Sequence, residues 1–493
     1  MVFTSPIFLF LFLPITLSLY FITKKSYRNL LLLTVSSLFY YFGEQNMLLL
    51  MYLVIGLNFA SALAMDYVDN KYGGITAHRN VTVLQYRKLI LIICVSICIA
   101  LLWYYKYWNF SIVVLNNIFA FVGIDYKFTL ADKIILPLGI SFYIFHCLSY
   151  TFDVYYRNLA AERSFINFAS YVMMFPQLVA GPIVRYIDIR YQFIKRSISL
   201  VGFANGIRRF CYGMAKKVLI ANTVAKAVDE VFAIPLGQMD IASAWIGALC
   251  YTLQIYFDFS GYSDMAIGLA AMFGFHYKEN FNYPYISKNI SEFWHRWHIS
   301  LSTWLRDYVY IVLGGNRTST YRYYTNILLV FLLSGLWHGA NTTFVLWGLW
   351  HGIFIIIECI FLKNVLKDKA LLAHIYALGV IIFGWVLFRA DTVAYGIGYW
   401  QVMLGAGANV VEQAYMPQND VVLAMLIGAV LSYDWRWAYR QGVLAAVAKL
   451  ENKPYMGFLG YKLASYAVAL LLFVVSVASI LSNTYNPFIY FRF

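Results

Sequence analysis

The sequence contains few charged residues, and one long stretch contains none. Charged side chains make up 12% of the 493 residues, against roughly a quarter in soluble domains. Residues 323–357, 35 in a row, include no Asp, Glu, Lys or Arg. Because 62% of the chain is also apolar, this scarcity of charge excludes an ordinary soluble protein and indicates a polytopic membrane protein.

Cysteine is also scarce, and its spacing excludes two common roles. The six cysteines are scattered through apolar segments, and Cys94 and Cys98 lie one helical turn apart in a predicted span. They form neither a metal-ligand pattern nor a disulfide framework. We interpret them as membrane-packing residues and expect no metal site.

The apolar segments predict an all-α fold. A crossing needs about 20 apolar residues, so the chain has room for roughly ten to twelve spans. The segment 241–274 is too long for one helix, and we expect it to break and bend or re-enter at Phe259–Asp264, where only a protein-lined site tolerates irregular backbone. The predicted segments are 6–23, 29–42, 47–65, 89–104, 109–123, 134–156, 165–182, 241–274, 325–338, 341–362, 370–389, 420–433 and 463–482.

The basic residues predict the topology. Loop 24–28 contains three cations, loop 43–46 none and loop 66–88 four, which places the amino terminus outside, with the first apolar segment retained as a span. Eight cations face one acid in 185–217. These cations suit anionic lipid headgroups, and together they also suit a polyanionic, nucleotide-bearing acyl donor.

The segment Asn289–Gly315 predicts one interfacial or shallowly re-entrant helix. Asn289 and Glu292 have the spacing of a capping box, and Gly314-Gly315 supplies a stop. An apolar stripe along the segment suggests tryptophans at headgroup level. His298 lies on the apolar side and His295 beside it, so His298 is expected to face protein, in a structural or a chemical role.

Two histidines stand in the charge-free stretch, each in a Leu-Trp-His-Gly context at His338 and His351. An ionisable group in hydrocarbon is costly and is a functional candidate by default. Histidine also gives and takes protons near neutral pH. The alternative for either residue is a hydrogen bond to a neighbouring helix.

Several motifs together resemble a known family. The runs Phe293–Tyr308, Gly314–Arg317 and Ser334–Asn341 closely resemble the membrane-bound O-acyltransferases, and within them the bacterial branch that acetylates alginate, peptidoglycan or cellulose. The likeness is nearly full length and also covers 137–143, 175–182 and 256–268. It implies one domain over 1–493, with core motifs at about 134–362, and a funnel of about eleven to thirteen helices.

The resemblance implies the site residues. His338 corresponds to the family's catalytic histidine and His298 to its companion, near the middle of a tunnel across the membrane, whereas His295 departs from the usual pattern. A neutral imidazole in an apolar tunnel suits a base, because desolvation disfavours its charged form. We expect support from Asn341, Asp307 and Trp337, and donor binding by Arg296, Arg306 and Arg317.

The predicted function is transfer of acetyl from cytosolic acetyl-CoA to an exported polysaccharide, directly or through a periplasmic SGNH (serine-hydrolase-like) partner. Alginate, peptidoglycan and cellulose all remain open as acceptors. The alternative is an acyl or polymer transporter with a histidine proton relay. The two Leu-Trp-His-Gly copies lie about 220° apart on a continuous helix, so they do not share a face, which favours the enzyme.

The remaining expectations concern location and surfaces. We expect a multi-pass protein of the bacterial inner membrane with a periplasmic amino terminus, in contact with lipid and not with nucleic acid, and without a permanently bound cofactor. The aromatic tail 487–493 is expected on the outward side of the funnel near His338. The loops 390–419 and 434–462 are the expected partner surfaces.

Overall fold

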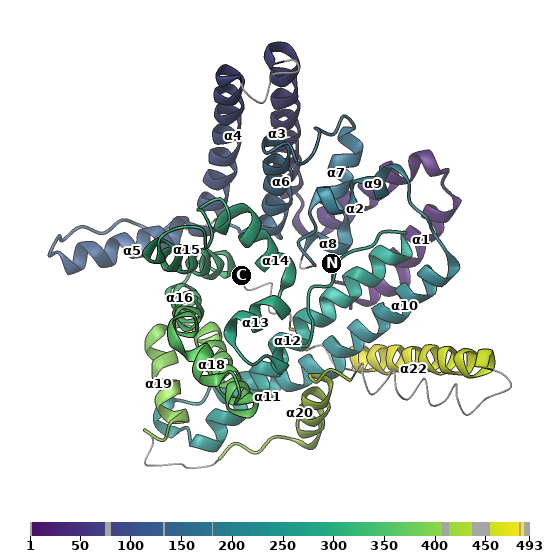
Figure 1. Ribbon diagram of the computed structural model, residues 1–493. Coiled ribbons are helices and arrows are strands. Elements are labelled where there is room, and N and C mark those ends of the chain that lie inside the picture. The colour runs from purple at the N-terminus through teal and green to yellow at the C-terminus, as the bar shows by residue number, and fades with distance from the viewer. Residues whose placement is uncertain are drawn as a thin grey trace. The chain divides into compact units, whose positions relative to one another are not determined.

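The chain is all-α, as predicted (Figure 1). A computed structural model describes residues 2–73, 80–131, 134–179, 181–406, 414–435, 454–482 and 485–487, and these contain helices and no strand. Five helical stretches are long and apolar enough to cross a membrane: Met47–Tyr72, Val81–Phe121, Thr342–Leu366, Ala370–Arg389 and Lys462–Ser482. The chain is therefore a multi-pass membrane protein.

Contacts divide the chain into two compact units, and the predicted single domain stays a prediction. Unit 1 comprises 1–199, 273–278 and 339–341, and unit 2 comprises 200–272, 279–338 and 342–493. Unit 1 contains α1 (Leu13–Ile22), α2 (Arg28–Glu44), α3 (Met47–Val68), α4 (Val81–Leu102), α5 (Trp108–Phe121), α6 (Ile140–Tyr155), α7 (Phe165–Met173), α8 (Phe175–Leu178) and α9 (Tyr186–Ile194).

Most helices of unit 1 match the predicted segments, but 165–182 is not one span. The helix stops at Met174, whose ψ of 115° is extended. Pro176 follows two residues later, and a proline nitrogen cannot donate the hydrogen bond that would continue α7. The single span predicted there is therefore wrong.

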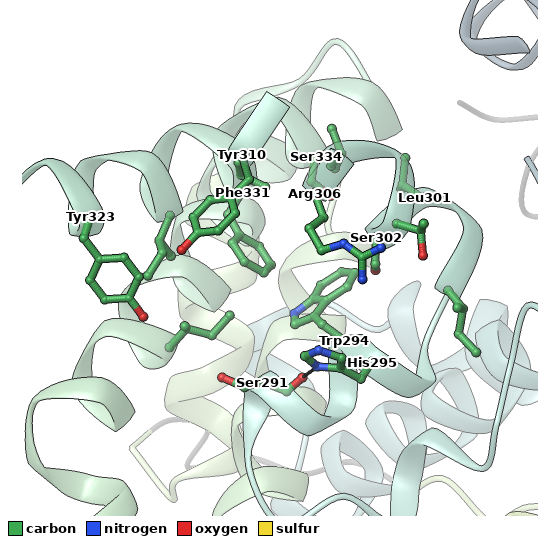
Figure 2. A pocket seen from close by; sticks show the side chains of 16 residues that line it. Ser291, Trp294, His295, Leu301, Ser302, Arg306, Tyr310, Tyr323, Phe331 and Ser334 are labelled. Carbon is green, nitrogen blue, oxygen red and sulfur yellow. Dashed lines mark hydrogen bonds between the residues drawn. The ribbon is translucent and has the colours of Figure 1, made fainter. Parts of the chain in front are cut away.

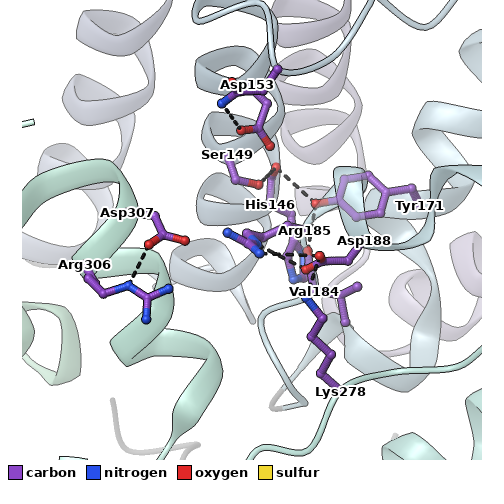
Figure 3. A network of polar contacts seen from close by, with 11 residues as sticks. His146, Ser149, Asp153, Tyr171, Val184, Arg185, Asp188, Lys278, Arg306 and Asp307 are labelled. Carbon is purple, nitrogen blue, oxygen red and sulfur yellow. Dashed lines mark hydrogen bonds and ion pairs between the residues drawn. The ribbon is translucent and has the colours of Figure 1, made fainter. Parts of the chain in front are cut away.

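Polar side chains inside unit 1 find protein partners. Asn58 on α3 accepts a hydrogen bond from Thr151 on α6 at 2.7 Å and lies 3.4 Å from the sulfurs of Cys94 and Cys98. The six cysteines are free thiols, and all of them except Cys359 are buried. Figure 3 shows a second group, in which Asp188 accepts from Arg185 at 3.1 Å and from Lys278 at 2.6 Å.

Unit 2 contains several helices that the hydropathy pattern missed. Its elements are α10 (Leu200–Ala215), α11 (Asn222–Phe232), α12 (Ile241–Met272), α13 (Ile290–Arg296), α14 (Ile299–Leu305), α15 (Thr320–His338), α16 (Thr342–Ile357), α17 (Lys363–Leu366), α18 (Ala370–Arg389), α19 (Val393–Met403), α20 (Asn419–Leu431) and α22 (Pro454–Ser482). Of the eight cations in the basic region 185–217, α10 carries only Arg208 and Arg209. Helix α19 lies within 390–406, so the predicted loop is wrong there. Residues 436–453 of the other predicted surface lie outside the described residues.

The predicted break in 241–274 is wrong, because α12 is helical from Ile241 to Met272. Its glycines bring two backbones together instead of ending the helix. A Cβ at Gly261 would lie 2.7 Å from the carbonyl oxygen of Gly213 on α10, and one at Gly268 would lie 2.7 Å from that of Gly206. Helices α10 and α12 therefore pack closely along this face.

The acids of α12 form ion pairs with α10 and with the helical stretch that follows it. Asp258 lies 2.7 Å from Lys217, and both side chains are almost fully buried. Asp264 lies 2.8 Å from Arg209 and 2.7 Å from Lys216. Since an unpaired charge in hydrocarbon is costly, these pairs fix the register of the two helices.

The close approach of α10 and α12 predicts the cost of a single methyl group. Gly261→Ala should lower the free energy of unfolding in detergent by about 1–3 kcal/mol, because the new Cβ meets backbone that cannot move aside. Gly379→Ala on α18 is the matched control, since nothing lies within 4 Å of its Cβ position. An equal effect of the two substitutions on unfolding by SDS titration would contradict the packing role of Gly261.

Candidate active site

The segment that carries His295 and His298 is two short helices, so the single predicted helix is wrong. Helix α13 ends at Arg296, α14 begins at Ile299, and His298 between them has a φ of +41°. The backbone N–H of Asn282 donates to the carbonyl of Arg296 at 2.9 Å, and that of Ile299 to the carbonyl of Asn280 at 2.9 Å. Two tertiary hydrogen bonds thus flank the left-handed turn and offset its strain.

The two ends of the segment Asn289–Gly315 agree with the prediction. The side chain of Asn289 accepts a hydrogen bond from the backbone N–H of Glu292 at 2.7 Å, which confirms the cap, and Glu292 in return accepts from the backbone of Lys288 at 3.0 Å. Gly314 and Gly315 adopt φ values of +101° and +58°, where glycine costs least, and they end the helical stretch.

The tryptophans of this segment lie inside the protein. Trp294, Trp297 and Trp304 are all buried within unit 2, so their predicted place at the lipid headgroups is wrong. Trp297 packs against Trp385 of α18 with ring centroids 4.8 Å apart. The sequence pattern cannot distinguish tryptophans at the lipid headgroups from tryptophans buried in protein, because an apolar stripe fits both surroundings equally well.

Asn280 fixes the orientation and tautomer of His298. The Asn280 side-chain oxygen lies 3.2 Å from Nδ1 of His298, and it also accepts from the Ser300 hydroxyl at 2.8 Å. The backbone N–H of Ser300, which can only donate, lies 3.2 Å from the same oxygen and assigns it to the His298 side, while the Asn280 amide group donates to Ser263 at 3.1 Å. Because an amide oxygen only accepts, Nδ1 carries the proton and Nε2 presents its lone pair.

His298 is completely buried, as predicted. Burial lowers the pKa of the His298 imidazole to about 3, so the ring is neutral at physiological pH. Its Nε2 has no hydrogen-bond partner among the described residues. A buried neutral imidazole with an available lone pair is suited to accept a proton or a hydrogen bond from a bound molecule.

His338 ends α15, and Trp337 links it to His298. The Trp337 indole lies 4.9 Å from the His338 ring and 5.7 Å from the His298 ring, centroid to centroid. His338 is 2% exposed, and Trp347 and Phe388 border it at 5.0 and 5.2 Å. The structure therefore brings the two predicted histidines and Trp337 into one aromatic-lined cluster.

His351 belongs to the same aromatic surroundings. Its ring lies 5.2 Å from Trp347, the indole that also contacts His338. The helical-wheel comparison of the two copies does not apply, because the chain leaves the helix at 339–341. Gly335 and Gly348 let α15 and α16 cross closely: a Cβ on Gly335 would lie 3.4 Å from the Gly348 Cα.

The other predicted site residues have the following surroundings. Asp307 pairs with Arg306 at 2.7 Å (Figure 3). Arg296 pairs with Glu292 at 2.9 Å, and Arg317 is exposed. Asn341 is half-buried and belongs to unit 1.

A polar cavity of about 540 Å³ adjoins the His298 turn. Asn280 and Ile299 line it on the histidine side, and Ser260 contributes a buried hydroxyl without a partner among the described residues. Its remaining lining includes Arg209, Lys216, Tyr256, Ser263, Asp264, Glu279, Asn282 and Tyr283. The sequence missed Asn280, although Ser260 and Ser263 lie in a motif that carried the family resemblance.

A second cavity, of about 370 Å³, is mainly apolar (Figure 2). It also touches Ile299, and Ser334 reaches it from α15 one helical turn before His338. Trp294 lines its wall, and His295 and Arg306 extend toward it. The His298 turn therefore lies between two cavities of different polarity.

The chain belongs to the membrane-bound O-acyltransferase family. The sequence profile described as "MBOAT, membrane-bound O-acyltransferase family" matches residues 37–394. The chain is 41% identical to a probable alginate O-acetylase AlgI of Azotobacter vinelandii and 40% to one of Pseudomonas aeruginosa, each over 100% of both proteins. It is 33% identical to a peptidoglycan O-acetyltransferase of Helicobacter pylori, over 82% of this chain and 80% of that protein.

Family membership defines the activity class. The chain is an O-acyltransferase of the membrane, and such an enzyme needs an acyl donor, an acceptor hydroxyl and a group that takes the hydroxyl proton. The cluster around Trp337 places two buried imidazoles together in the segment that the family profile covers.

The Asn280–His298 hydrogen bond predicts a fixed tautomer. In ¹⁵N NMR of histidine-labelled protein, His298 should stay neutral and protonated at Nδ1 from pH 8 to 5, and Asn280→Ala should give a mixture of tautomers. Since the unfolded chain takes this proton near pH 6.5 and the folded chain only near 3, the contribution to stability is complete above pH 6.5. It is lost as the pH falls towards 3.

Ser300→Ala serves as the control for that measurement. The Ser300 hydroxyl lies 3.3 Å from Nδ1 of His298 but donates its proton to the Asn280 oxygen at 2.8 Å, so its loss should leave the tautomer unchanged. A His298 signal that titrates near pH 6.5 in the wild-type protein would contradict the assignment.

Proposed function

We propose that the enzyme transfers an acetyl group from cytosolic acetyl-CoA to hydroxyl groups of an exported polysaccharide, with His338 as the base. The observation that carries this proposal is the pairing of two buried imidazoles around Trp337, at ring distances of 4.9 and 5.7 Å. The names of the full-length relatives, which are alginate O-acetylases, support acetyl as the acyl group.

The proposed reaction assigns one proton transfer to His338. Its imidazole takes the proton of the acceptor hydroxyl while the hydroxyl oxygen forms a bond to the thioester carbonyl carbon. The carbon–sulfur bond then breaks, and the thiolate of coenzyme A leaves and receives the proton from His338. Because Nε2 of His298 presents a lone pair, we assign it to accept a hydrogen bond from an amide N–H of the donor arm rather than to bind the oxyanion.

The polar cavity beside His298 suits the pantetheine arm of the donor. That arm is uncharged and carries amide groups, and the cavity offers the Asn282 side chain and the buried Ser260 hydroxyl. The cations that line it, Arg209 and Lys216, are neutralised by Asp264 and Glu279, so the cavity does not select for phosphate. We retain Arg296, Arg306 and Arg317 as proposed contacts of the nucleotide phosphates.

We propose a polysaccharide acceptor and favour alginate, because the alginate O-acetylases match this chain over its full length. Peptidoglycan, named in a more distant relative, and cellulose are the other candidates. Transfer is proposed to be direct or through a periplasmic SGNH partner. We further propose the bacterial inner membrane with a periplasmic amino terminus, and Asn341 and Asp307 as supporting residues.

The carboxy terminus adds one proposed element near the site. Residues 488–493 of the predicted aromatic tail lie outside the described residues, but Pro487 is described, and its carbonyl accepts a hydrogen bond from the buried Lys217. The side chain of Asn222 donates to that of Asn486 at 3.0 Å. These contacts tie the start of the tail to unit 2 and support a role for it on a defined face of that unit.

Loss of the base should abolish acetylation without affecting export. In cells that secrete the polymer, His338→Ala should reduce its acetyl content at least 100-fold, since a general base contributes about 10²–10⁴ in rate, while the amount of polymer stays unchanged. Mass analysis of the secreted polymer measures both quantities.

His351→Gln is the matched control, because it removes a second buried histidine from the same aromatic cluster, and acetylation per folded molecule should persist. Loss of secretion in His338→Ala would instead favour a transporter or channel with a histidine proton relay. Unchanged acetylation in that variant would exclude His338 as the base.

A further inference from the structure

Glu358 is a buried acid in the midst of an apolar helical stretch. It follows directly on the charge-free residues 323–357, lies within the apolar helical stretch Thr342–Leu366 and is 4% exposed. A carboxylate in such surroundings is costly unless protein groups stabilise it. The contacts of Glu358 therefore indicate its role.

Those contacts join Glu358 to the start of α13. One carboxylate oxygen accepts the backbone N–H of Ile290 at 2.6 Å, and the other accepts the backbone N–H of Ser291 at 3.2 Å and its hydroxyl at 3.3 Å. The hydroxyl of Tyr376 on α18 donates at 3.1 Å. The two backbone N–H groups can only donate, so both carboxyl oxygens of Glu358 act as acceptors.

Together with Asn289, Glu358 satisfies the amino end of α13. The first N–H groups of a helix have no partner within the helix. Here Glu358 takes those of Ile290 and Ser291, and Asn289 takes that of Glu292. A helix of seven residues is too short to hold its place alone, so the position of α13 depends on these side chains.

The position of α13 in turn determines where His298 lies. Only Trp297 separates the end of α13 from His298. Helix α13 also carries Trp294, which lines the apolar cavity. The Asn280 bonds hold the far side of the turn, so a shift of α13 would act directly on the turn.

We infer that Glu358 is a positioning residue for acyl transfer, which acts by fixing α13 and thereby the placement of His298. The inference rests on the proposed function. An apolar residue would pack as well as Glu358, and among the described residues Glu358 forms no hydrogen bond with His298 or His338. Neither packing nor chemistry at the reacting atoms therefore explains this buried acid, and a positioning role does.

The test compares purified, folded variants with acetyl-CoA and acceptor. Glu358→Gln keeps the size of the side chain but points an N–H₂ group at N–H donors, so kcat should fall about 10- to 100-fold, as expected for a misplacement of about 1 Å. The KM for acetyl-CoA should change less than threefold. Hydrogen exchange of the peptide covering 290–300 should rise in the same variant.

Tyr376→Phe is the matched control, since it removes the hydroxyl that donates to Glu358 and leaves the hydrogen bonds of α13 in place. It should lower stability with little effect on kcat or on exchange in 290–300. Asn289→Ala loosens α13 without touching the buried acid and should reproduce the loss of kcat. If Glu358→Gln does not fold, Asn289→Ala alone tests the positioning role.

The outcomes separate the inference from the proposed function. If the wild-type protein transfers no acetyl group, the proposed function fails. If the wild type transfers the acetyl group and Glu358→Gln keeps the wild-type kcat, only the positioning role is overturned. The same holds if Asn289→Ala shows raised exchange in 290–300 and keeps the wild-type kcat. A loss of kcat without a change in exchange in 290–300 also overturns it.

Discussion

Each charged side chain inside this protein has to find its partner in the protein, because the surrounding lipid offers none. The described interior follows this constraint closely. Lys217 pairs with Asp258 at 2.7 Å, and Glu358 accepts four hydrogen bonds from two separate elements. Such contacts are strong in a medium of low dielectric and costly to break singly, so they set the register of helices that hydrophobic burial alone would let slide.

The same constraint gives the candidate site its chemistry. His298 is held by an amide oxygen and not by a carboxylate, so its ring is oriented without gaining a proton. The strained turn at φ +41° places that ring against Phe259 and Trp337, at 4.7 and 5.7 Å between centroids. Aromatic walls exclude water, and an acyl thioester in such surroundings is protected from hydrolysis.

The sequence predicted the parts of the fold that depend on composition. Hydropathy located α18 at its observed limits, the rarity of charge singled out His338 and His351, and the apolar stripe of the segment 289–315 pointed to His298. Prediction failed where a local pattern has two physical meanings. The motif Phe259–Asp264 in α12 suggested a break, but its glycine provides close packing. The Trp-rich segment suggested one helix, but the chain turns at His298. Asn280 and Glu358 escaped prediction because their roles come from partners 18 and 68 residues away.

Transfer across the membrane by the two-histidine cluster is the central claim, and reconstitution tests it most directly. Proteoliposomes with the enzyme in one orientation receive acetyl-CoA, labelled in the acetyl group, on the side of the basic loops, and acceptor on the other side. The wild-type protein should produce labelled acceptor, and His338→Ala should produce none. Label that reaches the acceptor at equal rates with both proteins would contradict it.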